Sequence, residues 1–116
     1  MQGDWSADSG YERGRDLDAE AATAVFAAND RMALGLVHAL ADRGIRVPHD
    51  ISIVGFDDLP ETRHLHPLPT TIRQDFDALG TSAVMAAIAA IDDRGSGDRH
   101  LIPHLIERAS TARSLM

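Results

Sequence analysis

Polar side chains that can hydrogen-bond a small ligand follow two short apolar runs of the sequence. Asn29 comes after residues 24–28, and the pair Asp57 and Asp58 follows residues 51–56. An amide both donates and accepts hydrogen bonds, whereas a carboxylate only accepts them. If the two runs are neighbouring parallel strands, these side chains share the carboxyl edge of the sheet, where open α/β folds bind their ligands. The pattern therefore predicts a small-molecule site.

The same side chains make a poor catalytic centre. Asp57 and Asp58 are adjacent, so in an extended chain they point to opposite sides and do not form a facing acid–base pair. The sequence contains no Gly-x-Ser-x-Gly motif and no phosphate-cradling glycine loop. Zinc bound by these carboxylates with His64 and His66 is an alternative, but histidines in a proline-rich loop usually face solvent. We expect no enzyme, no metal and no cofactor.

Length and composition favour a single globular domain. The chain has 116 residues, 25% of them charged and 44% hydrophobic, which is enough for one core. A net charge of -7 argues against a stand-alone nucleic-acid binder, because phosphate contacts need a cationic face. The absence of cysteine excludes disulfides and thiolate sites. Because no signal-peptide or membrane-spanning pattern occurs, we expect a soluble cytoplasmic protein that does not contact a membrane.

The elements that must position these residues alternate between strand and helix. Residues 24–28 and 51–56 have the length and apolar character of buried strands. A helix begins at Asn29 or Asp30 and ends at Gly44, a usual C-terminal breaker. This order favours a right-handed parallel unit. The predicted fold class is α/β, a parallel sheet with flanking helices.

Further elements flank this unit. The local patterns predict, in chain order, a helix capped by Ser6 or Ser9, an irregular loop at 60–69, a short strand at 70–73, an alanine-rich helix from 75 to about 91, a turn at 95–97 and a last strand at 101–106. Pro103 lies within the last strand, which indicates an edge position or an irregular crossing.

The helix after Asn29 is apolar around well over half of its circumference, although one buried face needs an arc of roughly 100°. The sheet covers one side, and either the same chain or a second subunit covers the other. We favour a second subunit, which predicts a homodimer. The predicted interface residues are Leu34, Val37, His38, Ala41, His64 and Leu65.

Four blocks of sequence carry a resemblance to a known family. They are GDWS with SGY at 3–11, ANDRMALG at 28–35, RVPHDISIVGFDD at 46–58 and PLPTTIRQDF at 67–76. In this order they resemble the effector-binding domain of the lactose repressor (LacI/GalR) family. Members of that family join an N-terminal helix-turn-helix and a hinge helix to a two-lobed core similar to periplasmic sugar-binding proteins.

The resemblance implies that this chain is a partial lobe of a periplasmic-binding-protein-like fold. Residues 1–69 and 101–112 correspond to the C-terminal lobe, and 70–95 to a strand and helix that in the family cross to the N-terminal lobe. The helix-turn-helix is expected to be absent, so DNA would be bound only through that missing domain. The helix at 75–91 would then lack its usual packing partner and must fold back, pair with another copy or stay mobile.

The resemblance also implies an effector site. Trp5 matches an aromatic residue that stacks on a sugar ring or a base. Asn29 matches a residue that hydrogen-bonds effector hydroxyls, and Asp57 matches a carboxylate that accepts from them. Gln74 and Phe76 match positions near the lobe crossover that complete the pocket.

Other roles stay open for three of these positions. Trp5 would otherwise be a half-buried packing residue, and Asn29 would only cap the helix. Asp58 is interpreted as a structural cap of the loop that follows it.

Two functions fit these features. One is the effector-sensing and dimerisation part of a transcriptional regulator, with a small metabolite, most commonly a sugar, as the effector. The other is a periplasmic-type sugar-binding protein of a transport system, which shares the fold. The motif at 46–58 and the doubly apolar helix favour the regulator, and a helix-turn-helix or a signal peptide upstream in the gene would distinguish the two.

Overall fold

The computed structural model describes residues 1–92 and 101–114, so the predicted turn at 95–97 lies outside the described residues. The chain forms two compact units. Unit 1 contains Met1–Arg73 and the segment that begins at Leu105, and unit 2 contains the residues between them, Gln74–His104. In the described part of the chain, no helix has both the length and the apolar character needed to cross a membrane.

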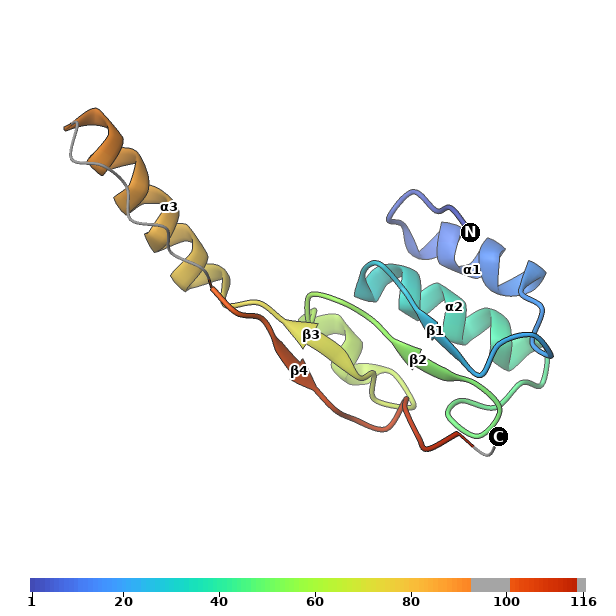
Figure 1. Ribbon diagram of the computed structural model, residues 1–116. Helices are drawn as coiled ribbons and strands as arrows, with labels where there is room; N and C mark the ends of the chain where they lie inside the picture. Colours follow the sequence, from blue (N-terminus) through green and yellow to red (C-terminus); the bar gives the residue numbers. More distant parts are fainter. Residues whose placement is uncertain (93–100, 115–116) are drawn as a thin grey trace. The chain divides into compact units, whose positions relative to one another are not determined.

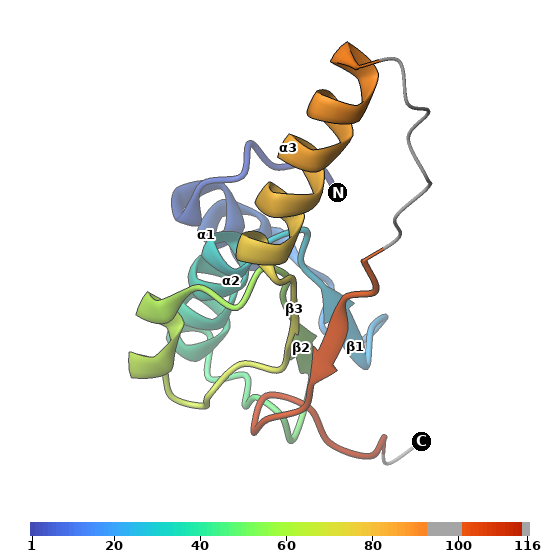
Figure 2. The same cartoon turned by 90° about the vertical axis from the view of Figure 1, so that its left-hand side faces the viewer.

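Unit 1 is built around the predicted strand–helix–strand segment. Strand β1 (Ala24–Phe26) and strand β2 (Ser52–Val54) pair in parallel, and Val25 lies opposite Ile53. Helix α2 (Asp30–Asp42) connects them and is followed by Gly44, whose φ of 73° suits a residue without a side chain. The α/β class and the parallel pairing are confirmed, and Figures 1 and 2 show α1 beside α2, with α2 next to the strands of this unit.

Helix α1 (Ala7–Asp16) packs directly on α2. Ser6 caps α1 by accepting a hydrogen bond from the Ser9 amide. The helices approach so closely that a Cβ on Gly35 would lie 1.8 Å from the Ala7 carbonyl oxygen. Part of the second apolar side of α2 is therefore covered by the same chain.

The core of unit 1 lies between α2 and the strands. Its buried members come from the end of β1, from α2 and from β2 with the residue before it, and they are Ala27, Ala33, Leu36, Val37, Leu40, Ile51 and Ile53. Burying such side chains contributes about 1.5–3 kcal/mol each for the larger ones. The predicted strands and helix α2 therefore supply the core together, and this core holds the carboxyl edge of the sheet in place.

The residues that follow β2 add further backbone to the carboxyl edge of the sheet. One helical turn, η1 (Pro60–His64), interrupts the proline-rich loop, and Thr70 then forms a parallel bridge with Val54. Strand β3 (Thr71–Arg73) pairs with β4 (His104–Ile106). The last strand is shorter than the predicted 101–106 and begins after Pro103, which lacks a donor for the strand ladder.

Strand β3 belongs to unit 1 of this chain. The physical reason is that Thr70 and Thr71 are buried and hydrogen-bonded to unit 1. Unit 2 contains helix α3 (Phe76–Ile91), which begins at the Asp75 cap and has no buried residue.

Candidate functional site

Backbone hydrogen bonds place the predicted site residues at one edge of the sheet. The Ala27 amide donates to the Val54 carbonyl oxygen at 2.8 Å, and the Asp30 amide donates to the Phe56 carbonyl oxygen at 2.8 Å. This pairing continues past the carboxyl ends of β1 and β2. The backbone at Asn29 and the backbone at Asp57 are therefore adjacent, at the edge of the sheet where α/β folds bind ligands.

Asp57 presents a carboxylate that is free to accept hydrogen bonds. Its φ is 105°, and its amide donates to the Ile72 carbonyl oxygen at 2.9 Å. The side chain is partly buried and has no hydrogen bond or ion pair within the described residues. Desolvation, and secondarily the negative charge of Asp30, raises the pKa of Asp57 above its ordinary value. A ligand hydroxyl would supply the donor that this carboxylate lacks.

Asn29 caps helix α2, as its alternative role required. Its side-chain oxygen accepts from the Met32 amide at 2.8 Å, and its Nδ2 donates to the Trp5 carbonyl oxygen at 3.0 Å. An amide side chain has two N–H donors and two lone pairs. One donor and one lone pair are not used by these two bonds, but Asn29 is buried, with 9% of its surface exposed. Its contact with an effector stays a prediction.

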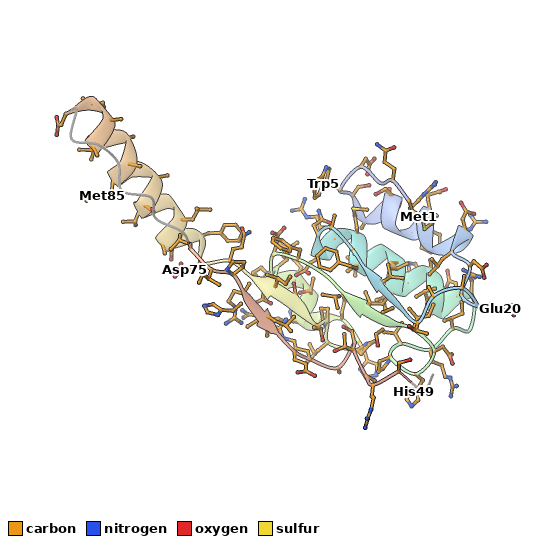
Figure 3. All side chains as sticks on the ribbon, in the orientation of Figure 1. Met1, Trp5, Glu20, His49, Asp75 and Met85 are labelled. Atoms are coloured by element: carbon orange, nitrogen blue, oxygen red, sulfur yellow. The ribbon has the colours of Figure 1, made fainter. Side chains whose placement is uncertain are left out.

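Trp5 lies in the loop before α1 and is exposed, with 63% of its surface accessible. Its backbone has φ 73°, and the Asn29 side chain holds its carbonyl oxygen. Figure 3 shows the indole projecting away from the two helices. This exposure contradicts the alternative in which Trp5 is a packing residue, and it leaves the ring face open to stack on a ligand.

Asp30 is a buried neighbour of the candidate site, and the sequence pattern had indicated only a helix cap at this position. The residue is fully buried, with Oδ1 accepting from the Thr71 hydroxyl at 2.7 Å and Oδ2 from the Leu59 amide at 2.9 Å. A Cβ on Gly55 would lie 2.1 Å from Oδ1, so a side chain at this position would displace the Asp30 carboxylate. The signal available in the sequence was an acidic residue at the start of the helix that follows a strand, although its partners lie far away along the chain.

Asp58 is anchored by two arginines, so its interpretation as a structural residue agrees with the structure, but it does not cap the following loop. Its Oδ2 lies 2.7 Å from Arg73 Nε and its Oδ1 lies 2.8 Å from Arg108 Nη1. The first amide of the following loop, at Leu59, is instead bonded to Asp30. Hydrogen bonds from Arg108 and then Arg73 lower the pKa of Asp58. Sequence reasoning missed these arginines because their separation from Asp58 carries no local signal.

The other two predicted effector residues belong to unit 2. Gln74 is its first residue, and Phe76 is the first residue of α3 and is exposed. Their role in an effector site stays a prediction. Elsewhere, the described residues contain no group of three or more side chains that could hold a metal ion, including around His64 and His66.

A groove of about 570 Å³ lies along α1, α2 and the loop at Leu65 in unit 1. It is lined by five of the six predicted dimer residues, which are Leu34, Val37, His38, Ala41 and Leu65. Leu34 is 36% exposed, whereas Val37 is 7% exposed and is already buried by its own chain. The groove includes none of the predicted effector residues.

Comparison with known sequences identifies the family. A profile of the periplasmic binding protein-like domain matches residues 1–111. The chain belongs to this family. Among related sequences, the lactose operon repressor of Escherichia coli K12 is 38% identical over 113 residues, which cover 95% of this chain and 31% of the repressor. The resemblance to the lactose repressor family is thereby confirmed.

Solved structures of repressors match this periplasmic binding protein-like domain closely. The lac repressor dimer bound to operator and the anti-inducer ONPF has a TM-score of 0.88 at 38% identity, covering 96% of this chain and 40% of that one. A LacI family regulator from Enterococcus faecium with bound ribose has a TM-score of 0.84 at 32% identity, covering 97% of this chain and 42% of that one. The present chain spans about a third of the curated relative's length.

Proposed function

We propose that this chain is part of the effector-sensing and dimerisation domain of a LacI-type transcriptional regulator. Its effector is a small metabolite rich in hydroxyl groups, with a sugar as the first candidate. Effector binding controls operator affinity, so the two affinities are reciprocally coupled. The proposal assigns the chain to binding rather than catalysis, and to the cytoplasm, where operator DNA is found.

The free carboxylate of Asp57 at the sheet edge is the observation that carries the effector proposal. It is partly buried and lies in a turn that is adjacent to the Asn29 segment. A ligand without a matching donor would leave the Asp57 charge unpaired in the closed site. The site therefore discriminates strongly against such a ligand. The related regulator with bound ribose supports a sugar as the ligand class.

The groove along α2 supports the dimerisation proposal. Its exposed apolar residue Leu34 lies beside buried Val37, and Ala41 continues the same side of the helix one to two turns further on. A second copy would cover this surface through a two-fold contact, in which each patch faces its equivalent. The related lac repressor is a dimer on its operator. DNA would be contacted only by a separate N-terminal domain.

Fluorescence of Trp5 provides a direct test, because this is the only tryptophan in the chain. We expect ribose or lactose to change the Trp5 emission in a saturable manner. Affinity should be weak for this chain, because binding costs are not offset by closure of a second lobe. Asp57→Asn should abolish the change, since it removes the charged acceptor and leaves the residue size unchanged.

Asp50→Asn is the matched control, because Asp50 is an exposed acid whose partner is Arg46. It should leave the fluorescence titration unchanged. Tight calorimetric binding by this chain would show that the site residues are wrongly divided between the two lobes. An unchanged titration in Asp57→Asn would remove Asp57 from the site.

A further inference from the structure

Asp58 lies at the meeting point of three segments that are remote in the sequence. It follows Asp57 directly, Arg73 is the last residue of unit 1 before the chain enters unit 2, and Arg108 follows the return of the chain at Leu105. Each arginine contacts a different oxygen of the one carboxylate. We call the three residues Asp58, Arg73 and Arg108 the ion cluster.

We propose that the ion cluster positions Asp57 by locking the turn that carries it to the outgoing and returning segments of unit 1. The inference deepens the proposed function, because it concerns the same effector carboxylate. Asp58 is a positioning residue in this proposal, since it acts on the effector through Asp57.

The burial of the cluster supports a specific geometric role. The Asp58 side chain is 4% exposed and that of Arg108 is 18% exposed, whereas that of Arg73 is 50% exposed. The Arg73 contact is a charge-assisted hydrogen bond, which is stronger than a neutral one, and the Arg108 contact is a shielded ion pair. Without the carboxylate, the two guanidinium groups would repel each other, and the segments that carry them would lose their common anchor.

Arg108 is itself held in place, so it serves as a fixed point. Its Nη1 donates to the Pro69 carbonyl oxygen at 3.2 Å, and its amide donates to Thr70 Oγ1 at 2.9 Å. Thr70 in turn contacts Thr111 Oγ1 at 2.8 Å. The returning segment is therefore tied to the start of β3 by contacts that do not involve Asp58.

The turn itself needs such an external anchor. Asp57 and Asp58 both have positive φ, 105° and 57°, in a region that residues with side chains rarely adopt. The Asp57 amide donates to Ile72, one residue before Arg73, so the same segment holds the turn by backbone and by side chain. Two consecutive residues keep this conformation only when contacts with the surrounding structure hold them in it.

Amide hydrogen exchange of Asp57, measured by NMR on this chain, tests the proposal. Asp58→Asn removes the charge but keeps a residue that tolerates positive φ. We expect it, and Arg108→Gln, to accelerate exchange of the Asp57 amide by about tenfold, which corresponds to about 1.4 kcal/mol. Arg108→Lys keeps the charge and should restore most of the protection. Arg73→Gln, at the half-exposed side, should give a smaller effect in the same direction.

The Ile53 amide is the internal reference, because it donates to the Ser110 carbonyl oxygen within the core. It should exchange as in the unmodified chain. Arg46→Gln, which breaks the exposed ion pair with Asp50, should leave the Asp57 amide unchanged. The three-bond coupling between the amide and α protons of Asp57 should change only in variants of the ion cluster.

Equal acceleration at Ile53 and Asp57 would show that the cluster merely stabilises the unit, and would overturn the proposal. Unchanged exchange at Asp57 in Arg73→Gln and Arg108→Gln would also overturn it, even if Asp58→Asn does not fold. Failure of the proposed function has a different signature. The Asp57 amide would respond to these substitutions, but ribose and lactose would leave Trp5 fluorescence unchanged.

Discussion

Replacing Asp30 by Asn should destabilise unit 1 although the two side chains have nearly the same shape. The buried carboxylate accepts hydrogen bonds from the Thr71 hydroxyl and the Leu59 amide with its two oxygens. Asn has only one oxygen, so it can accept only one of these bonds. If its amide group turns toward Thr71 it can donate to that hydroxyl oxygen, but the hydroxyl proton then loses its acceptor.

The magnitude follows from this hydrogen-bond count. Leaving one buried donor unsatisfied costs about 1–3 kcal/mol, and loss of the charge weakens the remaining bond as well. Asp30 also occupies the first turn of α2, where a negative charge contributes about 0.3–1 kcal/mol with the helix dipole. Relief from burying a charge offsets part of this sum. We therefore expect a net loss of about 2 kcal/mol.

Urea unfolding followed by circular dichroism measures this loss, provided that the denaturant slope is unchanged. Asp8→Asn is the matched control, because Asp8 is the exposed acid in the first turn of α1. The Asp8→Asn variant should lose no more free energy of unfolding than the helix-dipole contribution of about 0.3–1 kcal/mol. A loss for Asp30→Asn that equals the Asp8→Asn value would refute the assignment of Asp30 as the buried acceptor for Leu59 and Thr71.

Three further predictions concern assembly, DNA and pH. The chain should sediment as a dimer and Leu34→Arg as a monomer; a monomer of the unmodified chain at high concentration would contradict the interface. With a net charge of -7 it should bind DNA no better than other acidic proteins, which a salt-sensitive mobility shift would disprove. The pKa of Asp57 is raised because the folded chain disfavours the charged carboxylate. The stability that the protonated side chain contributes is therefore fully present below the ordinary pKa of 3.8, and it is lost as pH rises through the pKa in the folded state. Asp57→Asn should therefore melt higher than the unmodified chain at pH 7, and the difference should vanish in acid. The lowered pKa of Asp58 has the opposite sign, because its stabilisation is present above 3.8 and is lost as pH falls.

Local patterns were sufficient to predict the elements of unit 1. Strands β1 and β2 lie within the predicted apolar runs, and α2 ends before the predicted Gly44. These predictions succeeded because hydrophobic runs, caps and glycine breakers act over a few residues. The placement of Asn29 and Asp57 at one edge followed from the parallel pairing alone.

The amphipathic patterns predicted burial less well. The helix at 76–91 has the predicted span, but none of its residues is buried in this structure. On α2, the second apolar side is covered partly by α1, through the close approach at Gly35, rather than only by a second subunit. A helical wheel shows which side is apolar, but it contains no information on which segment covers that side.

By itself, the sequence determined the α/β class and the family, because these depend on short motifs and on residue types at strand ends. Only the tertiary structure showed that Asp30 is a buried acceptor and that Asp58 joins Arg73 and Arg108. Those contacts link residues that lie 15 to 50 positions apart. They form only after the chain has folded, and no periodicity or local preference encodes which distant partner a charged side chain will meet.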